Sequence, residues 1–114
     1  MIFETRHLVF TNTALRQAFA WYQRVPNQSD LPFGTITAVT PRVGGAVRVM
    51  VQQSGSSKGR EVAFEPSKTL GVLLLFCRRQ KVPIPRDAEK DIVPSDDGIM
   101  LTIRGKTATT APPP

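Results

Sequence analysis

Residues 6–10 read RHLVF and residues 60–64 read REVAF, and these two matching stretches decide the fold. Both follow the pattern Arg-x-aliphatic-x-Phe, whose alternation of apolar residues predicts a strand with one buried face. Each stretch is followed by residues that favour a helix start, by a helical pattern and by a Val-Pro pair. We therefore predict two similar halves, each with the element order strand, helix, strand, strand.

One amphipathic helix is predicted in each half. The first spans residues 13–24, and one of its faces carries Leu15, Ala18, Phe19 and Tyr22. Pro26 ends it, because the residue before a proline avoids helical backbone angles. The second spans residues 66–81, with an apolar stripe of Leu70, Leu73, Leu74 and Cys77. We expect this second helix at the centre of the core.

The remaining strands are predicted from period-two alternation. They cover residues 34–40, 46–52, 91–93 and 99–104. Turn residues at 41–45 and 94–98 favour two hairpins. The predicted fold class is α+β: a two-layer sandwich of two βαββ-type halves, with two helices packed on one face of a mainly antiparallel sheet.

The domain organisation follows from length and composition. A chain of 114 residues with 40% hydrophobic residues fits one small domain with its own core. We predict a single α+β domain over residues 1–104 and a disordered Pro/Thr-rich tail over residues 105–114. The single cysteine, the absence of a signal-peptide pattern and the short apolar runs predict a cytoplasmic protein without a membrane-spanning segment.

The charge is unevenly distributed. The formal net charge is +6, and residues 1–60 carry seven basic but only two acidic side chains. This balance favours an anionic partner, either nucleic acid or an acidic protein surface, although the same charge also serves solubility. Under the nucleic-acid hypothesis, phosphates are contacted by the hairpin residues Arg42, Arg48, Lys58 and Arg60.

Alternation also predicts which side chains face away from the helices. The inward set is Leu8, Phe10, Ile36, Ala38, Val47, Val49, Val51, Val62, Phe64, Ile99, Leu101 and Ile103. The outward set is His7, Val9, Thr35, Thr37, Val39, Arg48, Met50, Gln52, Glu61, Ala63, Met100, Thr102 and Arg104. Mixed Met, Val, Thr and Arg residues are typical of a contact surface, although any protein surface contains apolar atoms. The predicted interface residues are Met50, Met100, Thr102 and Arg104.

Catalysis and metal binding receive little support from the sequence. His7 has no partner nearby in the chain for general base work, and Cys77 lies on an apolar helix stripe that predicts a buried thiol. One His and one Cys cannot supply a tetrahedral zinc site. The loop at residues 55–59 lacks the residue order of a phosphate-binding loop. We therefore predict no metal site and no cofactor.

The resulting functional hypothesis is a small non-catalytic binding module. Protein interaction or homodimerisation through the open sheet face is favoured, because that face is rich in apolar side chains. The alternative is a basic nucleic-acid-binding protein that contacts phosphates through the hairpin arginines and lysine. A small enzyme ranks third.

Overall fold

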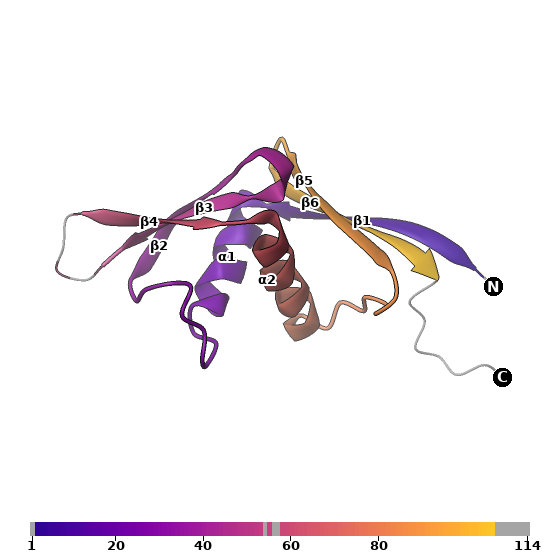
Figure 1. The fold of residues 1–114 in the computed structure, drawn as a ribbon, viewed down its shortest axis with the longest axis horizontal. Helices are drawn as coiled ribbons and strands as arrows, with labels where there is room; N and C mark the ends of the chain where they lie inside the picture. Colours follow the sequence, from indigo (N-terminus) through magenta and orange to yellow (C-terminus); the bar gives the residue numbers. More distant parts are fainter. Residues whose placement is uncertain (1, 54, 56–57, 107–114) are drawn as a thin grey trace.

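Two helices lie beneath two antiparallel sheets in the computed structural model, which describes residues 2–53, 55 and 58–106 (Figure 1). The elements follow the chain as β1 (Phe3–Thr11), α1 (Asn12–Tyr22), β2 (Thr35–Pro41), the 3₁₀ helix η1 (Val43–Gly45), β3 (Val47–Gln52), β4 (Gly59–Phe64), α2 (Pro66–Arg79), β5 (Glu89–Ser95) and β6 (Gly98–Lys106). The α+β class and the order βαββ–βαββ are therefore confirmed.

The two halves exchange strands. Sheet A has the order β1-β6-β5, and sheet B has the order β2-β3-β4. Each sheet thus combines the hairpin of one half with the first strand of the other half. In sheet A, Leu8 of β1 lies opposite Leu101 of β6, and in sheet B, Val62 of β4 lies opposite Val49 of β3. Alternation predicts the faces of strands but not their neighbours, so the division into two sheets was not foreseen.

The core fills the space between the sheets and the helices. Phe19 of α1 is fully buried, and its ring meets the ring of Phe64 edge-to-face at 5.0 Å. Complete burial of such a side chain contributes about 2–3 kcal/mol. Trp21 of α1 and Phe76 of α2 join the two helices, with ring centroids 5.9 Å apart. The strand-to-helix turn is fixed by Thr11, whose hydroxyl accepts a hydrogen bond from the Ala14 N–H.

A glycine turn connects the sheets. Gly45 in η1 is buried, has a φ of 93°, and packs against β5. A Cβ atom at this position would lie 2.5 Å from Cγ1 of Ile92. Only glycine fits, because both the close approach and the left-handed backbone exclude a side chain. The turn η1 of the first half therefore packs against β5, in the hairpin of the second half.

Most inward positions are buried as predicted, with Leu8 and Val62 half-buried. In β2 the prediction was wrong for Ala38, which is exposed, and for Val39, which is buried. The reason is a register shift between Ile36 and Ala38, which reverses the alternation beyond it.

The end of the predicted domain also differs. β6 continues through Gly105 to Lys106 by pairing with the start of β1. The rest of the predicted tail, residues 107–114, lies outside the described residues, as do residues 54, 56 and 57 of the loop before β4. Among the described residues, no helix has the length and apolar character needed to cross a membrane.

Candidate functional site

The four basic residues predicted to contact phosphates do not form one cluster. Arg48 lies on the outer face of sheet B, where its guanidinium pairs with Glu61 at 2.6 Å. Arg60 lies opposite the fully buried Val51 and so belongs to the helix side of the same sheet. Adjacent strands therefore place these two arginines on opposite faces.

Arg42 and Lys58 are separated along sheet B. Arg42 follows the end of β2, beside the Pro41–Val47 pair. Lys58 precedes Gly59, which pairs with Gln52 at the far end of β3. The strand between them is six residues long, which corresponds to about 20 Å. The positive charge of the hairpins is therefore spread out.

The predicted interface residues fall on the outer faces of both sheets. Met50 is half-buried between Ala38 and Glu61 on sheet B. Met100 is half-buried on sheet A, between Val9 of β1 and Val93 of β5. Val9 and Val93 are 55% and 43% exposed, so an apolar stripe crosses all three strands of sheet A.

A polar row runs beside this stripe. Nδ1 of His7 lies 3.2 Å from the Thr102 hydroxyl oxygen, and Asp91 lies on the other side of Thr102. Thr102 is only 6% exposed because it sits on the central strand, so it offers little contact area. Arg104 pairs with Asp91 at 3.2 Å. The outer face of sheet A thus has an apolar stripe with polar residues along one side.

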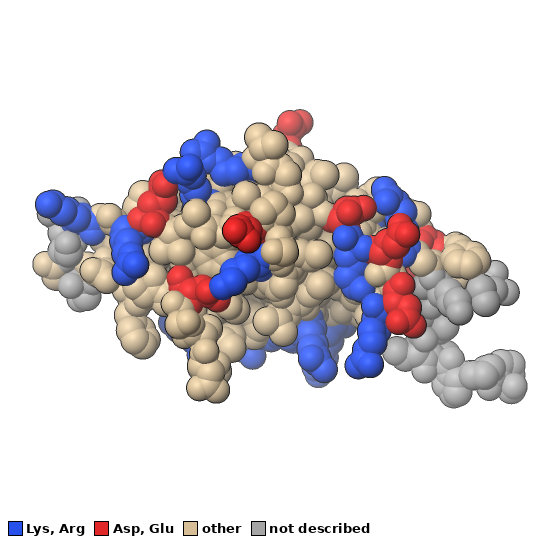
Figure 2. Space-filling view, viewed as in Figure 1, with Lys and Arg blue, Asp and Glu red and all other residues tan. Residues whose placement is uncertain are grey.

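A groove that the sequence did not reveal lies on the helix side of sheet A. It measures about 560 Å³ and runs between the C-terminal part of α2 and the segment that leads to β5. Its lining is Leu74, Leu75, Arg78, Lys81, Val82, Pro83, Ile84, Pro85, Arg86 and Lys90. These residues include four cations and no carboxylate. Basic side chains gather at the lower end of α2 in Figure 2, while acidic ones lie farther right, near the start of β5.

The end of α2 shapes one wall of the groove. The Val82 N–H donates to the Cys77 carbonyl at 2.9 Å, and the Lys81 N–H donates to the Arg78 carbonyl at 3.1 Å. This pair of bonds is the Schellman pattern, and it requires a left-handed residue after the helix. That residue is Lys81, with a φ of 61°. A lysine therefore occupies a position where glycine is usual.

Hydrogen bonds fix the opposite wall. The Lys90 ammonium donates to the carbonyl oxygens of Arg86 and Ala88 at 3.0 and 2.9 Å. Arg6 of β1 donates to the Pro83 carbonyl at 2.7 Å. The four cations of the lining share one groove only because the chain returns from α2 to β5, which the sequence pattern does not predict.

Comparison with known proteins gives no functional precedent. No protein-family model, curated protein or solved structure matches this chain. The role of the outer face and of the groove is therefore inferred from their chemistry.

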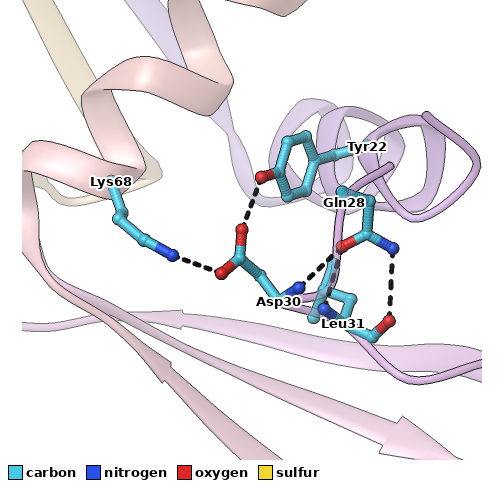
Figure 3. Close-up of polar contacts among 5 residues, drawn as sticks. All are labelled: Tyr22, Gln28, Asp30, Leu31 and Lys68. Carbon is cyan, nitrogen blue, oxygen red and sulfur yellow. Dashed lines mark hydrogen bonds and ion pairs between the residues drawn. The ribbon is translucent and has the colours of Figure 1, made fainter. Parts of the chain in front are cut away.

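A polar cluster ties the two helices to the connection after α1 (Figure 3). The Tyr22 hydroxyl donates to Asp30 at 2.6 Å, and the other Asp30 oxygen pairs with Lys68 of α2. Burial, reinforced by Asp30, raises the pKa of Tyr22 to about 12. The hydrogen bonds from Lys68 and Tyr22 lower the pKa of Asp30. At neutral pH the Tyr22 hydroxyl is therefore protonated and Asp30 is charged, which suits a structural brace.

Gln28 completes this brace. Its side-chain oxygen accepts from the backbone N–H groups of Asp30 and Leu31 at 2.9 and 3.0 Å. Its side-chain nitrogen donates to the carbonyl oxygens of Gln23 and Leu31 at 3.0 and 3.2 Å. One amide therefore closes the turn that presents Asp30 to both helices.

The cysteine lies in an unreactive environment. Cys77 is 3% exposed, and burial raises the pKa of its thiol against the opposing effect of Arg6. A protonated thiol is a poor nucleophile. Cys77 lines a smaller cavity of about 240 Å³ between β1 and α2. His7 of β1 also borders this cavity, while its ring lies beside Thr102 on the outer face of sheet A. In the described part of the chain, no three His, Cys, Asp or Glu side chains are grouped as a metal site.

Proposed function

We propose that this protein is a non-catalytic protein-binding module that self-associates through the outer face of sheet A. The observation that supports the proposal is the stripe formed by Val9, Met100 and Val93, which crosses every strand of the sheet. An exposed row of this kind favours burial against another apolar surface. A second copy of the chain is the partner that this face fits.

Most of the face matches itself under two-fold symmetry, apart from Arg104, which lies on β6 and would face its own copy while paired with Asp91. An axis along β6 would bring Val9 against the partner's Val93 and leave Met100 at the axis. The same rotation would bring His7 opposite the partner's Asp91, so that a basic group meets a carboxylate. Such an isologous contact uses one patch twice and closes without further growth.

The size of the face predicts a weak dimer. β1 and β6 are each nine residues long and β5 is seven, so the three strands together cover roughly 400 Å². This is about half of the ~800 Å² that each partner contributes to a standard stable interface. We therefore expect a dimer that dissociates on dilution, at concentrations on the order of ten micromolar.

Sedimentation velocity across a concentration series tests the proposal. The wild-type chain should shift from monomer to dimer, whereas Val9→Arg should stay monomeric because it places a charge in the stripe. Val43→Arg is the matched control, since Val43 is 92% exposed in η1 and lies off this face. A wild-type chain that remains monomeric at high concentration, or equal loss of the dimer in both variants, would contradict the proposal.

The nucleic-acid alternative is tested by the same sedimentation velocity experiment. Its proposed contacts are Arg42, Arg48, Lys58 and Arg60, which lie on different faces and ends of sheet B. A mixed-sequence oligonucleotide is added at low and at moderate salt. A monomer that shifts with the oligonucleotide and releases it as salt rises would reverse the ranking of the two functions.

A further inference from the structure

We propose that the groove between α2 and the segment that leads to β5 binds an acidic peptide segment of another protein, with aliphatic side chains among its carboxylates. The groove lies on the helix side of sheet A, away from the face used for self-association. The groove is therefore a second surface, and its proposed partner is a different molecule.

Charge identifies the first property of the occupant. The groove is lined by Arg78, Lys81, Arg86 and Lys90, without a carboxylate among its lining residues. The dipole of α2 accounts for a cation in its last turn, such as Arg78. It does not account for Arg86 and Lys90, which come from the following segment and from β5. Four cations along one groove favour an anionic ligand.

Lys81 gives a second, independent indication. Its φ of 61° is the conformation that a lysine disfavours and that glycine adopts without strain. Lys81 is nevertheless one of the residues that line the groove. Residues kept in such a conformation cluster at binding sites, where the side chain is needed.

The walls identify the second property of the occupant. They are aliphatic, with Leu74, Val82 and Ile84 beside the cations. Among the described residues that line the groove none is aromatic, so these residues offer no stacking surface of the kind that single-stranded nucleic acids use. Aliphatic side chains of a peptide would fit these walls while glutamate or aspartate reached the cations.

One wall of the groove is held in place by prolines and hydrogen bonds. Pro83 and Pro85 restrict the backbone of one wall. Arg6 and Lys90 hold the same wall through backbone carbonyl oxygens of Pro83, Arg86 and Ala88. A wall that is already ordered loses little entropy on binding.

Fluorescence anisotropy with three labelled probes tests the occupant. The first probe is a short peptide of repeated Glu-Glu-Leu units, the second replaces Leu by Ser, and the third is oligodeoxythymidylate. We expect the leucine peptide to bind more tightly than the serine peptide by about tenfold, because only the former fills the aliphatic walls. Equal binding of both peptides, or tighter binding of the oligonucleotide, would overturn the assignment.

Charge reversal locates the site. Arg78→Glu/Arg86→Glu should weaken binding of the leucine peptide by about tenfold or more. Arg42→Glu/Arg60→Glu changes the net charge equally at sites outside the groove, and it should leave binding within about twofold where the Debye length is near 8 Å. Circular dichroism confirms that both variants fold. Equal losses in the two variants would reduce the effect to net charge.

Two further variants separate this inference from the self-association. Val9→Arg should bind the leucine peptide like the wild type, because Val9 does not line the groove. Lys81→Gly should fold and yet bind the peptide more weakly. Equal affinity of Lys81→Gly and the wild type for the leucine peptide would contradict the assignment of Lys81 to the binding site.

Discussion

The Tyr22 hydroxyl donates a hydrogen bond of 2.6 Å to Asp30, and this contact joins α1 to the connection that precedes β2. Lys68 extends the contact to α2 through the second Asp30 oxygen. The cluster therefore joins the two halves of the chain through their helices, in addition to the strand pairing within each sheet. Its protonation states make it testable in both acid and alkali.

Alkaline titration should show the brace directly. The chain has one tyrosine, so the ultraviolet absorbance of tyrosinate reports Tyr22 alone. Its folded-state pKa of about 12 exceeds the ordinary value of 10.0, so the protonated form belongs to the folded state. The stabilisation should be complete below pH 10 and lost between pH 10 and about 12. Tyr22→Phe should lack this part of the alkaline loss, and a tyrosinate midpoint at the ordinary value would contradict the contact.

Acid should remove the contribution of Asp30. Its folded-state pKa lies below the ordinary 3.8, so its contribution is present above pH 3.8 and is lost as the pH falls through the lower folded value. At neutral pH, Asp30→Asn should reduce the free energy of unfolding by about 1 kcal/mol, as expected for a partly exposed pair. Urea unfolding at several pH values measures this difference. A deficit that persists unchanged in acid would show that packing, not charge, causes it.

The junction between the sheets should depend on one glycine. Gly45→Ala introduces a Cβ atom 2.5 Å from Ile92, in a turn already left-handed, and should destabilise the fold by about 2–4 kcal/mol. Gly44→Ala is the matched control, because Gly44 has a similar positive φ and its Cβ would meet only Pro66 at 3.9 Å. It should lose about 1 kcal/mol. Equal losses in urea unfolding would mean that Ile92 moves aside without penalty.

Much of the fold could be predicted from the sequence because its elements have clear periodicity. Phe10 and Phe64 close the two matching stretches, residues 6–10 and 60–64, and both are buried, as the repeated pattern predicts. The strand order within each sheet could not be predicted, because alternation indicates which face of a strand is buried but not which strand lies beside it. Val39 shows a related limit, since one bulge in β2 reversed the faces beyond it.

The candidate site was harder to predict from the sequence than the fold. Lys81 and Lys90 were visible as charges, but their shared groove depends on the path of the chain after α2. The predicted set of Arg48 and Arg60 failed to cluster for a local reason, because their pairing partners lie on opposite faces of sheet B. Short separation in sequence therefore did not place the hairpin arginines on one face of sheet B. It also gave no indication of the groove, whose residues come from α2, the segment after it and β5.

Cross-linking should locate the self-association axis. In a Cys77→Ser background, Met100→Cys should form a disulfide-linked dimer under mild oxidation, because Met100 lies near the proposed axis on β6. Met50→Cys is the matched control on the outer face of sheet B and should remain a monomer. Non-reducing electrophoresis distinguishes the two. Dimer formation by Met50→Cys alone would move the interface to sheet B.

The backbone of Lys81 links stability to binding. Replacement by glycine removes the strain of a left-handed lysine and keeps the N–H bond to Arg78, so Lys81→Gly should stabilise the fold by about 1 kcal/mol. For a domain of this size, the thermal midpoint should rise by about 4 °C. The same variant should bind the Glu-Glu-Leu peptide less tightly, because the groove loses one of its four cations. Calorimetry and anisotropy on one preparation measure both effects. A variant that is less stable than the wild type would show that the lysine side chain supports the fold, which would remove strain as evidence for a ligand.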